Sequence, residues 1–215
     1  MRLAQLKRTY DAVFSLGDRC FTSGKLIDYG LRPYSGVLDW VKTDTLANVS
    51  MLLRNRFASY MELQHMRVID YHDNGTKLLV KDTMYNMISG HDFKVAENPH
   101  HQLVTYPAFR EKINRRIHRF YTMLEHAQCL LFVRTKGSYE EALELQSVLS
   151  SFVKHQFHVL LINDTHHYVV FENDWNIPNV CAIQTPLYTE GNKELWDCIF
   201  TGIQYIGSLH GDKEV

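Results

Sequence analysis

The chain has 215 residues, of which 45% are hydrophobic and 22% are charged, and this is the composition of a folded globular protein rather than a disordered one. Its 23 Lys and Arg against 24 Asp and Glu leave a formal net charge of −1, so there is no global electrostatic reason to bind nucleic acid or an anionic membrane. A chain of this length can bury enough surface to fold without a disulfide or metal staple.

Four cysteines stand at positions 20, 129, 181 and 198, and no two have the C-x-x-C spacing of a zinc or thioredoxin site. Although there are 12 histidines, they are scattered, so we expect no metal and no other cofactor. The first eight residues lack the apolar run of a signal peptide, and no stretch approaches the ~18 apolar residues of a membrane span. We therefore expect a cytoplasmic protein with reduced thiols, and the oligomeric state stays open.

The first half of the chain begins with a short apolar strand at 11–17. A helix should follow, with Asp18 as its N-cap and Gly30 as the residue just after its end. A second helix is predicted from Thr43 to Phe57, because apolar residues recur there at helical spacing.

The segment from about 64 to 93 changes to a strand pattern. Residues 66–71 and 76–80 flank Asn74-Gly75, which is a strong hairpin signal. A further extended run at 84–89 leads into Gly90-His91-Asp92-Phe93, and residues 94–105 are expected to form a loop. We expect this segment to be an antiparallel hairpin insertion.

The second half alternates helices with apolar strands. Pro107 suits the first turn of a helix, and Ser138 with Glu141 forms a capping box for the next one. Continuous apolar strands are predicted at 129–133, 157–162 and 180–183, and a short strand at 168–171. A closing helix is predicted at 192–206, with Leu195, Ile199 and Ile206 on its inward face. Strands that are apolar on both faces indicate a buried parallel sheet. The expected fold is thus a single α/β domain over 1–215, with a mostly parallel sheet flanked by helices.

Ligands bind outside the carboxyl ends of the strands in open parallel sheets. Every predicted strand is apolar, yet polar residues follow each one: Gly17, Asp18, Arg19 and Cys20; Arg134 and Thr135; Asn163 and Asp164; Gln184 and Thr185. Either these exits are ordinary polar loops, or they form one site. We predict that Cys20, His91, Arg134 and Asn163 line one cleft at this edge.

Cys20 is the sharpest candidate for a reactive group. In the first turn of a helix, free amides and the helix dipole stabilise a thiolate, and Arg19 adds to this while Asp18 opposes it. The alternative is a small buried apolar residue, and Cys129, Cys181 and Cys198 fit that description better. Cys20 is therefore predicted to be the thiol that is alkylated fastest.

A thiol nucleophile needs a base and a group that orients the base. His91 is the best candidate base, with His166 and His167 as rivals. Asp39, Asn163 and Asp164 are alternative orienting groups, whereas Asp92 is not assumed, because adjacent side chains of an extended chain point to opposite faces. The basic run at 115–119 reads as a solvated helix face.

The run Ser15-Leu16-Gly17-Asp18-Arg19-Cys20 resembles the N-terminal signature of a bacterial protein family of unknown function, known as putative papain-like cysteine peptidases. Residues 31–40, which end in Asp39-Trp40, are similar to a second motif, with Val37-Leu38 in place of Pro-Phe. His91-Asp92-Phe93, the arginines at 115–119 and residues 131–134 are similar to later motifs, so the resemblance covers roughly residues 11–165. It implies Cys20 as nucleophile and His91 as base, and a papain-like α+β fold as the alternative to α/β.

Three classes of function remain open from the sequence. The first is a thiol-dependent hydrolase of a small-molecule or peptide substrate, with Cys20 and His91 catalytic, Asp39 or Asn163 orienting, and Gly17, Asp18, Arg19, Arg134 and Asp164 binding substrate. The second is a non-catalytic module that binds an anionic small ligand at residues 17–20, at a helix N-terminus. The third is a structural or interaction protein.

Overall fold

The largest sheet contains the four apolar strands that the sequence predicts. The computed structural model describes residues 1–189 and 191–207. The sheet has the order β2-β7-β8-β10-β9, with β2 at Ala12–Ser15, β7 at Cys129–Thr135, β8 at Gln156–Asn163, β10 at Val180–Gln184 and β9 at Phe171–Asn173. The first four are parallel, and only the edge strand β9 runs antiparallel. The mixed α/β fold with a mostly parallel sheet is therefore confirmed.

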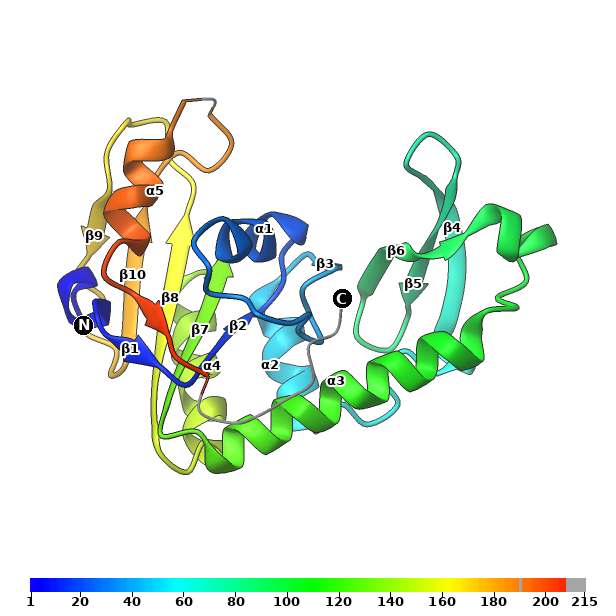
Figure 1. The fold of residues 1–215 in the computed structure, drawn as a ribbon, viewed down its shortest axis with the longest axis horizontal. Helices are drawn as coiled ribbons and strands as arrows, with labels where there is room; N and C mark the ends of the chain where they lie inside the picture. Colours follow the sequence, from blue (N-terminus) through cyan, green and yellow to red (C-terminus); the bar gives the residue numbers. More distant parts are fainter. Residues whose placement is uncertain (190, 208–215) are drawn as a thin grey trace.

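Helices cover both faces of this sheet (Figure 1). On one face lie α2 (Leu46–Arg54), the C-terminal part of α3 (Tyr106–His126) and α4 (Tyr139–Phe152), and on the other lie α1 (Cys20–Asp28) and α5 (Lys193–Phe200). Alternate residues of each strand face opposite layers, so Leu130 packs in the first core and Leu131 in the second. Both are buried, which is why the strands are apolar throughout.

A second, antiparallel sheet has the order β3-β6-β5-β4. Its strands are β3 at Val41–Thr43, β6 at Met87–Lys94, β5 at Lys77–Asp82 and β4 at Met66–His72. The predicted hairpin insertion at 64–93 supplies three of these strands, and β3 adds the fourth. Helix α3 runs from this sheet to the main sheet (Figure 1). Its Phe109 ring packs on Phe93 at 4.8 Å, and its Phe120 ring packs on Phe14 at 4.9 Å, so one apolar core joins the two sheets.

The remaining elements are short. A two-stranded parallel ribbon joins β1 (Thr9–Tyr10) to β11 (Gln204–Tyr205). Single 3₁₀ turns lie at Leu3–Leu6, Leu63–His65, Val95–Glu97 and Pro99–His101. The capping box of α4 is present as predicted, since the Ser138 hydroxyl accepts from the Glu141 amide at 3.2 Å and the Glu141 carboxylate accepts from the Ser138 amide at 2.9 Å.

Several local predictions differ from the structure. Arg19, not Asp18, is the N-cap of α1, because Asp18 has a left-handed backbone (φ 78°) that an N-cap does not adopt. The short strand lies at 171–173 rather than 168–171. The closing helix ends at Phe200, since the chain turns at Gly202 with φ 90° and continues into β11.

The inward face of this last helix also differs from the prediction. Ile199 is buried as predicted, but Trp196 and Phe200 complete the stripe, whereas Ile206 lies beyond the helix and is exposed. Cys198 was expected on the buried face, but its position on the other side of the stripe leaves it exposed. Leu195 is half-buried, so the buried stripe of α5 keeps Ile199 but is otherwise formed by Trp196 and Phe200.

Candidate functional site

A pocket of about 430 Å³ lies between the start of α1 and the antiparallel sheet. One wall comes from the α1 start and the chain leading into β3, and the other from strands β4 to β6. The lining residues are Arg19, Cys20, Trp40, Lys42, His72, Leu79, Ile88, Gly90 and His91. Cys20 and His91, which are 71 positions apart in the sequence, thus face the same space.

Cys20 is the first residue of α1, and its side chain is exposed. The preceding turn needs a glycine at Gly17, because φ is 81° there and an added Cβ would lie 3.3 Å from Thr43 Oγ1. The amides in the first turn of a helix have no acceptor within the helix, and the dipole places partial positive charge at this end. The turn therefore presents the sulfur to the pocket beside hydrogen-bond donors.

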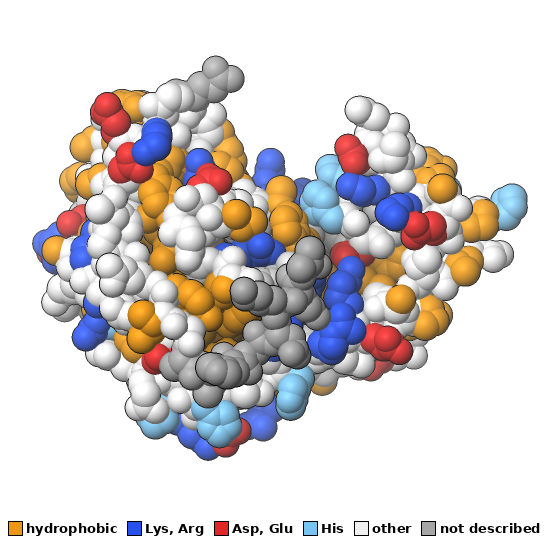
Figure 2. All heavy atoms as spheres, viewed as in Figure 1, with side chains coloured by type: hydrophobic (Ala, Val, Ile, Leu, Met, Phe, Trp, Pro, Cys, Tyr) orange, Lys and Arg blue, Asp and Glu red, His pale blue; other side chains and the backbone are white. Residues whose placement is uncertain are grey.

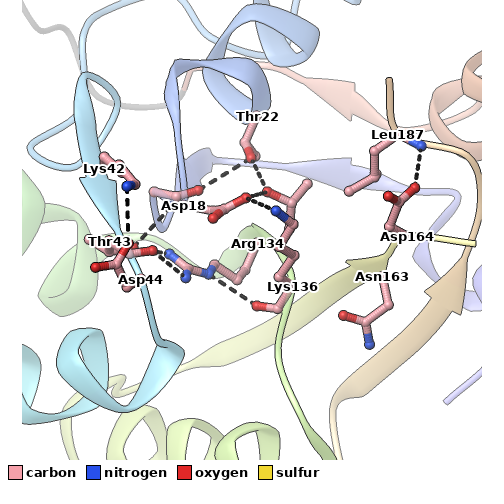
Figure 3. A network of polar contacts seen from close by, with 12 residues as sticks. Asp18, Thr22, Lys42, Thr43, Asp44, Arg134, Lys136, Asn163, Asp164 and Leu187 are labelled. Atoms are coloured by element: carbon pink, nitrogen blue, oxygen red, sulfur yellow. Dashed lines mark hydrogen bonds and ion pairs between the residues drawn. The ribbon is translucent and has the colours of Figure 1, made fainter. Parts of the chain in front are cut away.

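Polar contacts fix this turn to its neighbours (Figure 3). The Asp18 amide donates to Thr43 Oγ1 at 3.1 Å, which ties the turn to β3. The buried Asp18 carboxylate accepts from Thr135 Oγ1 at 3.0 Å and lies 3.9 Å from Lys136 Nζ. Thr22 of α1 donates to the Gly17 carbonyl at 3.3 Å. Asp18 is therefore part of the scaffold under Cys20 and does not line the pocket.

Arg134 has no exposed surface and sits beneath the same turn. Its guanidinium donates to the carbonyls of Leu16 at 2.9 Å and Thr43 at 3.2 Å, to Thr43 Oγ1, and to the Lys136 carbonyl at 3.2 Å. Burial lowers the pKa of this guanidinium to about 10, which still leaves it charged at neutral pH. The guanidinium donates its hydrogen bonds to acceptors of the protein itself, and Arg134 lies below the pocket rather than in its lining.

His91 projects from an irregular part of β6. The register between β5 and β6 shifts between Leu78 and Val80, so residues 90–92 bulge out of the ladder. The imidazole ring meets those of Trp40 and His72 edge to face, with centroids 5.6 Å and 5.3 Å away. Partial burial lowers the pKa of His91 below its usual value, and the charges of His72 and Lys77 lower it further. The bulge thus supplies a histidine that stays neutral at neutral pH.

Asp92 faces away from this histidine. Its carboxylate accepts from Ser89 and from Lys112 of α3, the latter at 2.5 Å. Within residues 1–189 and 191–207, no hydrogen bond joins Cys20 to His91, and none reaches a His91 ring nitrogen. Ring packing, rather than a carboxylate, therefore holds the His91 side chain in this state of the protein.

Asp39, a predicted orienting group, is buried next to the pocket but is used elsewhere. It forms an ion pair with Arg32 and accepts from the Gly36 amide at 2.6 Å. Arg32 in turn lies over the Trp40 indole, 5.1 Å from the ring centroid. Asp39 therefore supports Trp40, and through it the packing of His91.

The two other predicted residues at the sheet edge lie apart from the turn network in Figure 3. Asn163 exchanges two hydrogen bonds of 3.0 Å with the backbone of Gly137, where α4 begins. Asp164 accepts from the Leu187 amide at 2.9 Å. Neither Asn163 nor Asp164 lines the pocket, and neither do His166 and His167.

The remaining cysteines differ in exposure. Cys181 is fully buried, and burial raises the pKa of its thiol to about 12. Cys129 is half-buried, and burial raises the pKa of its thiol as well. Cys198 is exposed, but it does not line this pocket. Cys20 is thus the cysteine that the structure combines with a histidine in one pocket.

Sequence reasoning did not select Trp40, Lys42 and His72, although all three line the pocket. The motif that ends in Asp39-Trp40 implies no role for Trp40 itself. Lys42 lies in β3, which contacts between Thr43 and Asp18 tie to the turn before Cys20, and His72 lies in β4 of the same sheet. No local spacing in the sequence carries this information.

Among the described residues, no group of three or more His, Cys, Asp or Glu side chains is placed to hold a metal ion. In the same part of the chain, no helix has both the length and the apolar content needed to cross a bilayer.

Residues 11–167 match the family described as “Putative papain-like cysteine peptidase (DUF1796)”. The chain belongs to this family. The matched segment contains both walls of the pocket, including Cys20 and His91, and ends before β10 and α5. The chain is also 28% identical over 176 residues to uncharacterized protein R408 of Acanthamoeba polyphaga mimivirus, an alignment that covers 73% of this chain and 78% of that protein. No solved structure matches the chain.

Proposed function

We propose that the protein is a thiol-dependent hydrolase in which Cys20 is the nucleophile and His91 the general base. The observation that carries the proposal is the shared pocket, which holds a cysteine at a helix start and a histidine from the opposite sheet. A papain-like enzyme likewise sets a helix-borne cysteine against antiparallel strands, and the family description supports this chemistry. The main parallel sheet is then the scaffold that carries the cysteine.

In the first step, the Cys20 sulfur attacks the carbonyl carbon of the substrate while His91 accepts the thiol proton. The imidazole can do so because its lowered pKa keeps it neutral near pH 7. The two side chains must approach within hydrogen-bond reach when substrate closes the pocket, and loose geometry of this kind is common in the free state of an enzyme.

The oxyanion that forms would be stabilised by backbone amides at the start of α1. The amides of Gly17 and Asp18 already donate to the hydroxyls of Ser15 and Thr43. We therefore assign this role to the amide of Cys20, helped by that of Arg19. Protonated His91 then gives its proton to the leaving group, and a thioester remains on Cys20.

The second step returns the enzyme to its starting state. His91 takes a proton from water, the resulting hydroxide adds to the thioester carbonyl, and the Cys20 thiolate leaves. The acid product departs and the thiolate regains its proton. Each turnover consumes one acyl substrate and one water molecule, and the proton that returns to the Cys20 thiolate comes from His91.

A non-catalytic anion site on the same turn has less support. An anion seated on the amides of residues 17 and 18 would meet donors already in use and the buried carboxylate of Asp18. That carboxylate would repel a second negative charge. The amides of residues 19 and 20 would serve an anion or an oxyanion equally, so it is the pairing of Cys20 with His91 in one pocket that favours the hydrolase.

The test is hydrolysis of a panel of fluorogenic acyl amides, esters and thioesters by the purified chain. We expect Cys20→Ala to remove the activity and Cys198→Ala, which changes the other exposed thiol, to retain it. Mass spectrometry after rapid quenching should find an acyl group on the peptide that contains Cys20. Equal turnover by wild type and Cys20→Ala would reject the proposal.

A further inference from the structure

Among the residues that the structure describes, the pocket that holds Cys20 is lined by basic side chains and by no acidic one. Arg19 directly precedes α1 and Lys42 lies in β3, while His72 and His91 come from β4 and β6 of the sheet to which β3 also belongs. Figure 2 shows Lys, Arg and His side chains gathered on the facing sides of the notch between the two parts of the molecule. The chain as a whole has a formal net charge of −1, so this positive lining is local to the pocket.

The carboxylates around the pocket are already engaged by other groups. Asp92 is paired with Lys112, and Asp39 with Arg32. Asp73, in the loop after β4, is paired with Lys77 at 2.9 Å.

On the cysteine side, Lys42 has one ion-pair partner within residues 1–189 and 191–207. This partner is Asp44, at 3.3 Å, and both side chains are about half exposed. An exposed pair of this kind contributes little and exchanges readily for another partner. Arg19, also exposed, has no ion-pair or hydrogen-bond partner among the described residues. A ligand can therefore use both cations without breaking a buried interaction.

The floor of the pocket is apolar. Trp40, Leu79 and Ile88 supply its hydrophobic surface, and Gly90 lets the strand approach His72 because an added Cβ would lie 3.1 Å from that ring. A volume of about 430 Å³ is within the range of small-molecule sites. The lining thus offers a short apolar surface bordered by cations.

We infer that the substrate is an acyl compound with an anionic group, a carboxylate or a phosphate, close to the scissile carbonyl. The anion lies between Arg19 and Lys42, and the hydrocarbon next to the carbonyl rests on Trp40. The inference rests on the proposed function for the position of the carbonyl, but the preference for an anion at Cys20 can be measured without any turnover.

The experiment compares alkylation of Cys20 by iodoacetate and by iodoacetamide, which differ in charge and hardly in size. Both reagents consume the same thiolate, so the ratio of the two rates cancels the thiolate fraction and reports the local field. The attraction between two unit charges about 4 Å apart in water is about 1 kcal/mol, which changes a reaction rate by a factor of roughly five. At low salt, we therefore expect the ratio of the iodoacetate rate to the iodoacetamide rate at Cys20 to exceed the same ratio for free glutathione about fivefold. Raising the salt to 1 M should remove most of this excess.

The matched variants are Arg19→Gln/Lys42→Gln and, as a control, Lys94→Gln/Lys154→Gln, which removes two exposed lysines outside the pocket. The first should lower the ratio at Cys20 to that of glutathione, and the second should leave it unchanged. Peptide mapping of Cys198 in the same samples gives the ratio of an exposed thiol outside the pocket.

Competition separates the two anion chemistries. Glutarate should slow the reaction of Cys20 with neutral iodoacetamide if the site takes carboxylates, inorganic phosphate should do so if it takes phosphates, and neutral glutaramide should not. A ratio at Cys20 equal to that of glutathione, unmoved by the Arg19 and Lys42 changes, would overturn the inference. An inactive protein that keeps the high ratio would reject the hydrolase proposal alone.

Discussion

The indole ring of Trp40 and the imidazole ring of His91 meet edge to face across the pocket, with centroids 5.6 Å apart and planes inclined at 65°. Trp40 comes directly before β3, and His91 comes from the bulge of β6. Arg32 lies over the Trp40 ring, and the His72 ring also meets the His91 ring edge to face, with centroids 5.3 Å apart. A row of four planar groups, Arg32, Trp40, His91 and His72, therefore sets the position of the proposed base.

Replacing Trp40 tests this row. Trp40→Phe keeps an aromatic edge for His91, whereas Trp40→Ala removes both the ring pair and the site of the Arg32 cation. We expect Trp40→Ala to lower kcat at least about tenfold, as misplacement of a catalytic group does, and to lower stability by about 1–2 kcal/mol. Kinetics with the best substrate of the panel, together with urea unfolding, measures both effects. A Trp40→Ala enzyme with wild-type kcat would show that the ring does not position His91.

The pH dependence of activity should follow His91. Burial lowers the pKa of His91 below its ordinary value of about 6.5, and the charges of His72 and Lys77 lower it further. The neutral base is therefore present at pH values above this lowered pKa and is lost as the pH falls through it. Activity should therefore rise with pH through a midpoint below about 6.5 and be level at neutral pH. Removing the charge at His72 should move the midpoint upward, so His72→Gln should lose activity at pH 6 and keep it at pH 8.

The measurement is kcat/KM against pH, with the His91 Cε1–H signal followed by NMR titration. Lys94→Gln, which removes an exposed cation at the end of β6, serves as the control because Lys94 does not contribute to the pKa of His91. An acid limb that stays in place after His72→Gln would contradict the assignment of His91 as the titrating base.

The main sheet could be read from the sequence because its signals are local. Strands such as β7 and β8 are buried on both faces, so their apolar runs identify them, and the capping box at Ser138 fixes the start of α4. Glycine and proline marked the turns. Where the prediction was wrong, as at the N-cap of α1, a tertiary contact decided the backbone: the Asp18 amide bonds to Thr43 of another strand.

The residues that line the pocket were harder to predict from the sequence than the main sheet. The rule that ligands bind at the carboxyl ends of parallel strands placed Cys20 there, but it also selected Arg134 and Asn163, which the structure uses to hold loops. Much of the lining comes from the antiparallel sheet, which Thr43 of β3 ties to the turn before α1 and whose Phe93 packs on Phe109 of the long helix α3. Long-range packing of this kind leaves no periodic trace, so Trp40, Lys42 and His72 could not be selected.

Arg134 is expected to act on stability. Arg134→Met would leave the carbonyls of Leu16 and Thr43 without a buried donor, and breaking such a buried charged network costs about 3–5 kcal/mol. Arg19→Met removes an exposed cation and should change stability by no more than about 0.5 kcal/mol. Urea unfolding measures the free energy of unfolding of the two variants and of the wild type. A stable Arg134→Met protein with a raised KM would instead restore Arg134 as a substrate-binding residue.

Two glycines near Cys20 should respond in opposite directions to alanine. Gly17 has φ 81°, and an added Cβ would lie 3.3 Å from Thr43 Oγ1 and 3.4 Å from the Val41 carbonyl, so Gly17→Ala should destabilise the protein by about 1–3 kcal/mol. Gly24 lies within α1 with nothing within 4 Å of an added Cβ, so Gly24→Ala should stabilise it by about 0.5–1 kcal/mol through the lower entropy of the unfolded chain. Because the turn at Gly17 presents Cys20, Gly17→Ala should also slow alkylation of that thiol by iodoacetamide, whereas Gly24→Ala should not.

Thermal unfolding and peptide-resolved alkylation rates test both variants. If Gly17→Ala keeps the wild-type alkylation rate, the turn does not control how Cys20 faces the pocket.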